Sequence, residues 1–141
     1  MRTFLGIVAG IVAAFAVQIG IDVLTNKLYP VAISDMWDRA QVTQAMASRP
    51  TPALLLTVLG FFLGALAGGY VARRLSGVGW TVWVPAGVLA AMALIISVAY
   101  PVPAWTWFAT LAAPLIGGMI AGHLGPRATA PATEASDDAD L

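Results

Sequence analysis

The chain has 141 residues, of which 60% are hydrophobic and 10% charged, and its formal net charge is zero. A soluble domain carries about 25% charged residues, and a chain this short cannot bury so much apolar surface in one core. The composition therefore excludes an ordinary soluble domain. The absence of a basic block argues against a nucleic-acid partner, and the absence of cysteine excludes disulfides and thiol chemistry.

Four long apolar stretches predict four membrane-spanning helices, over about residues 4–24, 53–72, 80–99 and 104–122. Each is close to the ~20 residues that a helix needs to cross the hydrocarbon layer. The alternating pattern of a membrane barrel is absent. Because backbone polar groups in lipid must bond internally, we expect an all-α fold. The predicted domain, residues 1–124, is a compact four-helix transmembrane bundle made of two helical hairpins.

The two predicted hairpins share short patterns, which suggests a duplicated unit. Pro-x-Pro-Ala opens both the second and the fourth span, at residues 50–53 and 101–104. The segments 66–75 and 115–124 align in a Leu, a Gly-Gly pair, an Ala and a final Leu. Parallel repeats of this kind occur in some transporter folds. The second and fourth helices are therefore expected to play equivalent packing roles.

The polar segments lie between the first two spans and after the last. In the loop 30–51, Ser34 is a typical N-cap and Pro50 ends the run, which predicts a short extracytoplasmic helix over residues 35–48. Residues 125–141 are rich in Pro, Ala, Thr and acidic side chains. Such a composition cannot bury enough apolar area to offset the entropy of ordering, so we predict a disordered acidic cytoplasmic tail.

The flanking cations predict the orientation of the chain. One side of the membrane would carry four of them and the other side three: Arg2, Arg73, Arg74 and Arg127 against Lys27, Arg39 and Arg49. The positive-inside rule then places both termini in the cytoplasm. In an alternative interpretation the first span is a signal peptide cleaved after Ala14-Phe15-Ala16. The apolar stretch continues to Leu24, which favours a retained helix.

Every predicted span carries small residues spaced four apart, a pattern that lets helix backbones approach closely in lipid. The glycines predicted to pack helices together are Gly6, Gly10, Gly60, Gly64, Gly68, Gly117 and Gly118. One interpretation is that these rows pack the four spans of one chain against each other. The other is that one row faces a second copy, forming a homo-oligomer, or faces another membrane protein.

Polar groups within the predicted spans are few. Gln18 and Asp22 continue the small-residue row of the first span, and Asp22 lies about 27 Å along the helix from Phe4 at 1.5 Å per residue. This places Asp22 near the outer boundary of the membrane. It is either an anchor tied to Asn26, Lys27 or Arg49, or a proton or cation site working with Gln18.

Residues typical of catalysis or of a cofactor site are not found in the sequence. Nucleophile motifs, phosphate-binding loops and paired carboxylates are missing. His123, at the inner end of the fourth span, has no second metal ligand nearby in the pattern. We therefore predict no catalytic, cofactor-binding or metal-binding residue, and no enzymatic activity.

A Tyr-Pro pair follows the first span at residues 29–30, and Met-Ala-Ser-x-Pro precedes the second at residues 46–50. Leu63-Gly64, Gly68-Gly69 and Ala72 then follow on the second span. In this pattern, over residues 1–125, the chain resembles an uncharacterised family of small bacterial four-span integral membrane proteins. The resemblance implies a multi-pass protein of the bacterial inner membrane. It implies no activity and assigns no functional residue.

Two functions are compatible with these features. The first is a non-enzymatic structural, accessory or interaction subunit in the lipid bilayer, packed through its small-residue helix faces. The alternative is a small oligomeric transporter or channel with Asp22 and Gln18 near its outer mouth. The alternative requires these two side chains to line a cavity between helices, whereas the first hypothesis expects them to face lipid headgroups or the first loop.

Overall fold

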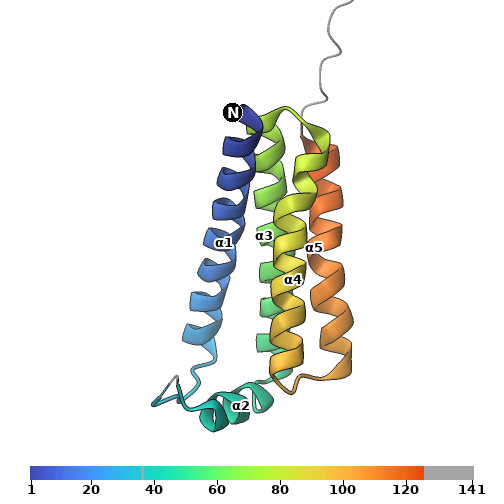
Figure 1. Cartoon of the computed structure of the whole chain (residues 1–141). Helices are drawn as coiled ribbons and strands as arrows, with labels where there is room; N and C mark the ends of the chain where they lie inside the picture. Colours follow the sequence, from blue (N-terminus) through green and yellow to red (C-terminus); the bar gives the residue numbers. More distant parts are fainter. Residues whose placement is uncertain (36, 126–141) are drawn as a thin grey trace, which may run out of the picture.

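The computed structural model describes residues 1–35 and 37–125. Its elements, in chain order, are α1 (Arg2–Leu28), α2 (Arg39–Ala47), α3 (Thr51–Ser76), the 3₁₀ turn η1 (Gly79–Val82), α4 (Trp83–Ala99) and α5 (Ala104–Leu124). Figure 1 shows the four long helices side by side in one bundle, with α2 across one end. We call this the α2 end, and the opposite end, where the N-terminus and the end of α5 lie, the terminal end. Apart from Gly125, the predicted acidic tail lies outside the described residues.

Among the described residues, four helical segments are long and apolar enough to cross a membrane, which fits a multi-pass membrane protein: α1, α3, η1 with α4, and α5. The predicted all-α, four-span bundle is thereby confirmed. The observed helices match the predicted spans to within about one turn, and α1 and α3 extend further at their C-terminal ends. Hydropathy marks only the apolar part of a span, whereas the hydrogen-bonded helix continues into polar flanks such as Lys27 and Arg73.

The predicted helix over residues 35–48 is wrong at its start. The observed α2 begins at Arg39 and is capped by Asp38, whose carboxylate accepts hydrogen bonds from two backbone N–H groups of the first turn. The Ser34 hydroxyl instead bonds the Gln41 side-chain oxygen, at 2.9 Å. Both residues are good N-caps, but the Asp38 carboxylate also interacts favourably with the helix dipole.

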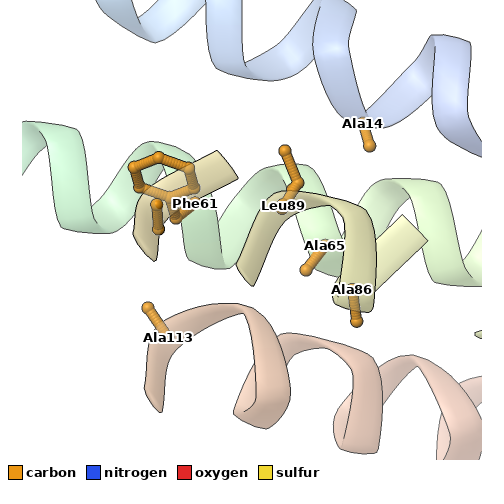
Figure 2. Packing of buried hydrophobic residues seen from close by; sticks show 7 residues of the cluster. Ala14, Phe61, Ala65, Ala86, Leu89 and Ala113 are labelled. Atoms are coloured by element: carbon orange, nitrogen blue, oxygen red, sulfur yellow. The ribbon is translucent and has the colours of Figure 1, made fainter. Parts of the chain in front are cut away.

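The centre of the bundle is built mainly from small side chains. Helix α3 packs against α1, α4 and α5. Leu89 of α4 and Phe61 of α3 fill the core, as Figure 2 shows, among alanines from all four long helices. These are Ala14, Ala65, Ala86, Ala93 and Ala113. A core of this kind holds the helices through close backbone contact rather than through large interlocking side chains.

Helices α1 and α3 approach each other closely along a row of glycines. A Cβ atom on Gly10 would lie 2.6 Å from the Gly68 carbonyl oxygen, and a Cβ on Gly68 would lie 2.6 Å from the Gly10 carbonyl oxygen. One turn along the seam, a Cβ on Gly64 would lie 2.9 Å from the Ala14 oxygen. A Cβ on Gly6 would lie 2.9 Å from the Ala72 oxygen. There is thus no space for a side chain at these positions.

The two glycines of α5 contact different neighbours. A Cβ on Gly117 would lie 2.5 Å from the Phe62 carbonyl oxygen of α3. A Cβ on Gly118 would lie 2.9 Å from the Ala86 side chain of α4. On α3, a Cβ on Gly69 would lie 2.9 Å from the Ala121 side chain of α5. The glycines that were predicted to pack helices together therefore face helices of the same chain, as the first interpretation of the small-residue rows requires.

Replacing Gly68 with alanine is expected to lower the free energy of unfolding by about 1–3 kcal/mol, because the new methyl group meets backbone atoms that cannot move aside. The matched control is Gly87→Ala on α4, where a Cβ would meet nothing within 4 Å. Unfolding of both variants is followed by circular dichroism during thermal melting in mild detergent. A Gly68→Ala protein as stable as the Gly87→Ala protein would contradict the close seam.

Candidate functional site

Most of the buried polar residues of the described spans line a cavity at the α2 end. The cavity has a volume of about 220 Å³ and lies between α1, α3, α4 and α5, with Met46 of α2 and Arg49 of the following loop at its edge. One buried water needs ~10–15 Å³ of such space, and a ~150 Å³ cavity can hold a molecule as large as benzene. The space is therefore sufficient for a small organic solute or for several waters.

On α1, the face that packs on α3 changes from small to polar along its length. Gly6, Gly10 and Ala14 contact α3 in the half near the terminal end. Gln18 and Asp22 follow on the same row and line the cavity. Their position toward one end of the bundle is consistent with the prediction that Asp22 lies near a boundary of the membrane.

Other helices show the same change toward the α2 end. On α4, Ser97 follows Leu89 and Ala93 at spacings of four, and on α5, Thr106 and Thr110 precede the buried Ala113. Because successive spans run in opposite directions, the polar extension of each buried face reaches the same end of the bundle. Ser97, Thr106 and Thr110 all line the cavity together with Gln18.

Gln18 is the most deeply buried polar side chain of the cavity, with 2% of its surface exposed. Its amide lies over Gly60, where a Cβ would be 3.0 Å from the Gln18 oxygen and 3.1 Å from the nitrogen. Gly60 therefore makes room for a polar side chain, whereas Gly64 and Gly68 admit a neighbouring backbone. This distinguishes Gly60 from the rest of its predicted packing row.

The hydrogen bonds of Gln18 are incomplete. Its Nε2 donates to both carboxylate oxygens of Asp22, each at 3.4 Å, which is longer than the usual range of about 2.7–3.2 Å. This contact fixes the orientation of the amide, because an oxygen at that position would be repelled by the carboxylate. The Gln18 Oε1 atom is buried and has no hydrogen-bond partner within the part of the chain that the structure describes.

Thr106 carries the second buried polar atom without a partner. It is 4% exposed, and its hydroxyl oxygen Oγ1 makes no hydrogen bond among residues 1–35 and 37–125. One turn along, the Thr110 hydroxyl donates to the Thr106 carbonyl oxygen at 2.7 Å. A buried polar group left unpaired costs about 1–3 kcal/mol. Both residues line the same cavity, which has room for a water or a solute that would complete these hydrogen bonds.

At the edge of the cavity, Arg49 joins the loop after α2 to α1. Its Nη2 atom donates to the Asn26 side-chain oxygen at 3.1 Å. Of the partners predicted for Asp22, Arg49 and Asn26 thus bond each other, and the Asp22 carboxylate accepts from Gln18. The half-buried Asp22 lies between the deep amide and this exposed bridge, one helical turn from each.

The remaining candidate from the sequence lies elsewhere. His123 is exposed near the terminal end and its Nδ1 contacts the Met119 carbonyl oxygen at 2.9 Å. Within the described residues, no three His, Cys, Asp or Glu side chains lie close enough to hold a metal ion.

Sequence reasoning missed Thr57, Ser97, Thr106 and Thr110, which complete the cavity. The available signal was positional. On the second, third and fourth spans, hydroxyl side chains extend the buried small-residue face at the end that the topology brings toward Gln18.

Comparison of the chain with protein-family models, curated proteins and solved structures found no match. The resemblance to small bacterial four-span proteins therefore stays a prediction.

We expect the two threonines of α5 to respond differently to valine. Thr106→Val removes a hydroxyl that makes no internal hydrogen bond, so the free energy of unfolding should stay the same or rise. Thr110→Val removes the hydrogen bond to the Thr106 carbonyl and should lower the free energy of unfolding by about 1 kcal/mol. Thermal melting of both variants in one detergent measures the difference. A Thr106→Val protein that is clearly less stable than Thr110→Val would show that Thr106 has a structural partner.

Proposed function

We propose that this chain is a multi-pass protein of the bacterial inner membrane whose helical bundle binds a small solute in the cavity at the α2 end, as a transporter or channel does. The observation that supports this most directly is that Gln18 and Thr106, whose Oε1 and Oγ1 atoms are buried without a hydrogen-bond partner among the described residues, both line one cavity of about 220 Å³. Concave sites lined mostly by apolar groups with a few polar ones are typical of ligand binding.

The lining of the cavity favours a solute site over a structural role. A bundle selected only for packing would gain stability by replacing Gln18 and Thr106 with apolar residues of similar shape. The structural hypothesis expected Gln18 and Asp22 to face headgroups or the first loop, whereas both line the cavity. The alternative that the sequence left open is therefore the better supported one.

The cavity favours binding over chemistry. The hydroxyls of Thr57 and Thr110 donate to backbone carbonyls of their own helices, at 3.2 and 2.7 Å, rather than to a general base. A nucleophilic hydroxyl needs a neighbouring base to take its proton. We therefore keep the prediction that the protein is not an enzyme.

The outer surface of the bundle suits a lipid environment. Large apolar side chains such as Ile95, Val98 and Phe108 are 68%, 70% and 77% exposed. Arg2, Arg73 and Arg74 lie toward the terminal end, which supports a cytoplasmic position for that end under the positive-inside rule. The cavity would then open toward the outside of the cell.

The solute-binding proposal is tested by thiol labelling, for which the cysteine-free chain is a ready background. Ser97→Cys places a thiol in the cavity. Small membrane-impermeant methanethiosulfonate reagents, added outside intact cells, should modify it about tenfold faster than a thiol in lipid, because only the hydrated thiolate reacts.

The matched control is Ile95→Cys, two residues away on the same helix but on its exposed side. Equal, very slow labelling of both variants, in intact cells and after the membrane is permeabilised, would show that the cavity is not open to water and would overturn the proposal. Labelling of Ser97→Cys alone supports it.

The orientation is tested separately with one cysteine at each end of the bundle. Ser48→Cys, after α2, should be labelled in intact cells. Gly79→Cys, between α3 and α4, should be labelled only after the membrane is permeabilised. The reverse pattern would place both termini outside and contradict the predicted N-in, C-in topology.

A further inference from the structure

The hydrogen-bonding groups that face the α2-end cavity are mostly acceptors. The Asp22 carboxylate and the unpaired Gln18 Oε1 can only accept. The hydroxyl hydrogens of Thr57 and Thr110 are already donated to the Ala53 and Thr106 carbonyl oxygens. These two hydroxyls therefore offer the cavity their lone pairs, and a ligand that satisfies the site must bring the hydrogens.

Two donor groups of the cavity are already engaged, and the Thr106 hydroxyl can donate as well as accept. Gln18 Nε2 faces the Asp22 carboxylate. The Arg49 guanidinium donates to Asn26 in an exposed bond at the edge of the cavity. The negatively charged Asp22 is thus next to the buried Gln18, whereas the positively charged Arg49 is on the solvent side of the cavity. Charge and hydrogen bonding both favour a cationic donor in the interior.

The apolar part of the lining selects among cations. Leu54, Phe61, Met92 and Ile96 form much of the wall. A hard metal ion such as Ca²⁺ takes about six to eight oxygen ligands, usually with several carboxylates. Among the described lining residues Asp22 is the one carboxylate. An organic cation, with N–H groups at one end and an apolar body at the other, matches both parts of the wall.

We propose that the solute is a small organic ammonium ion, whose N–H groups bond Asp22, Gln18 Oε1 and Thr106 Oγ1 while its apolar part contacts the Phe61 side of the cavity. This proposal rests on the proposed function, since it names the class of solute for the same site. It would supply hydrogen-bond donors to both unpaired buried atoms.

The experiment compares two methanethiosulfonate reagents that differ in charge, one with a primary ammonium group, which carries N–H donors, and one with a sulfonate, on the purified full chain in mild detergent. The ratio of their labelling rates at Ser97→Cys is divided by the ratio at Ser48→Cys, which removes their different intrinsic reactivities. We expect the corrected ratio to favour the cation by about tenfold or more, because a lining charge of opposite sign concentrates the reagent.

Two further variants, each made in the Ser97→Cys protein, assign the preference to Asp22. Asp22→Asn should abolish the preference, whereas Asp22→Glu, which keeps the charge, should retain it.

Protection by a free ligand is a second measurement. Propylammonium should slow the labelling of Ser97→Cys, and 1-butanol and butyrate at the same concentration should not. Circular dichroism of the purified full chain checks that each variant is folded.

The outcomes separate the two proposals. Rapid labelling of Ser97→Cys without charge preference, or with preference for the sulfonate, overturns the ammonium ligand and leaves the solute cavity standing. A preference unchanged in a folded Asp22→Asn protein, or a lack of protection by propylammonium, also overturns it. Failure of both reagents to label Ser97→Cys overturns the proposed function itself.

Discussion

The close contact between α1 and α3 is the constraint on which the rest of the bundle depends. In lipid, apolar side chains gain little by leaving their surroundings, so helices associate through van der Waals contact between backbones. Gly10 and Gly68 allow this contact, with no room for a Cβ on either side. Because α3 also packs against α4 and α5, the position of every span is set relative to this one helix. The alanine-rich core is the result, with Leu89 and Phe61 filling the space that small residues leave.

The same contact determines where the cavity forms. Along α1, the face toward α3 consists of small residues up to Ala14 and then continues with Gln18 and Asp22. Longer polar side chains on that face need space, which Gly60 supplies for the Gln18 amide. The half near the terminal end is thus tightly packed, and it holds the polar groups of the other half in fixed positions. Sites built on rigid helices are more precise than sites on loops, and they often keep polar groups that reduce stability.

The sequence predicts the spans well because span length and hydropathy are local properties, and residues 53–72 and 104–122 required no knowledge of the neighbouring helices. It predicts the start of α2 poorly because Ser34 and Asp38 are competing N-caps, and the choice depends on contacts such as that of Ser34 with Gln41. Of the residues that line the cavity, the sequence singled out only Gln18 and Asp22 of α1 as functional candidates. A threonine in a membrane helix normally bonds the carbonyl four residues back, as Thr110 does. The sequence alone therefore does not distinguish Thr106 from such a threonine. Its unpaired hydroxyl becomes significant only when three other helices bring polar groups beside it.

The packing of the glycines also bears on the two functions that the sequence left open. The strongest argument for an interaction subunit was the set of small-residue rows, each a possible contact face for another protein. A Cβ atom built on any of the glycines that we singled out would lie within about 3 Å of atoms from another part of this chain. These glycines are therefore occupied in building the bundle and do not require an external partner. What packing alone leaves unexplained is Gln18 and Thr106, and the proposal of a solute that supplies hydrogen-bond donors rests on these two residues.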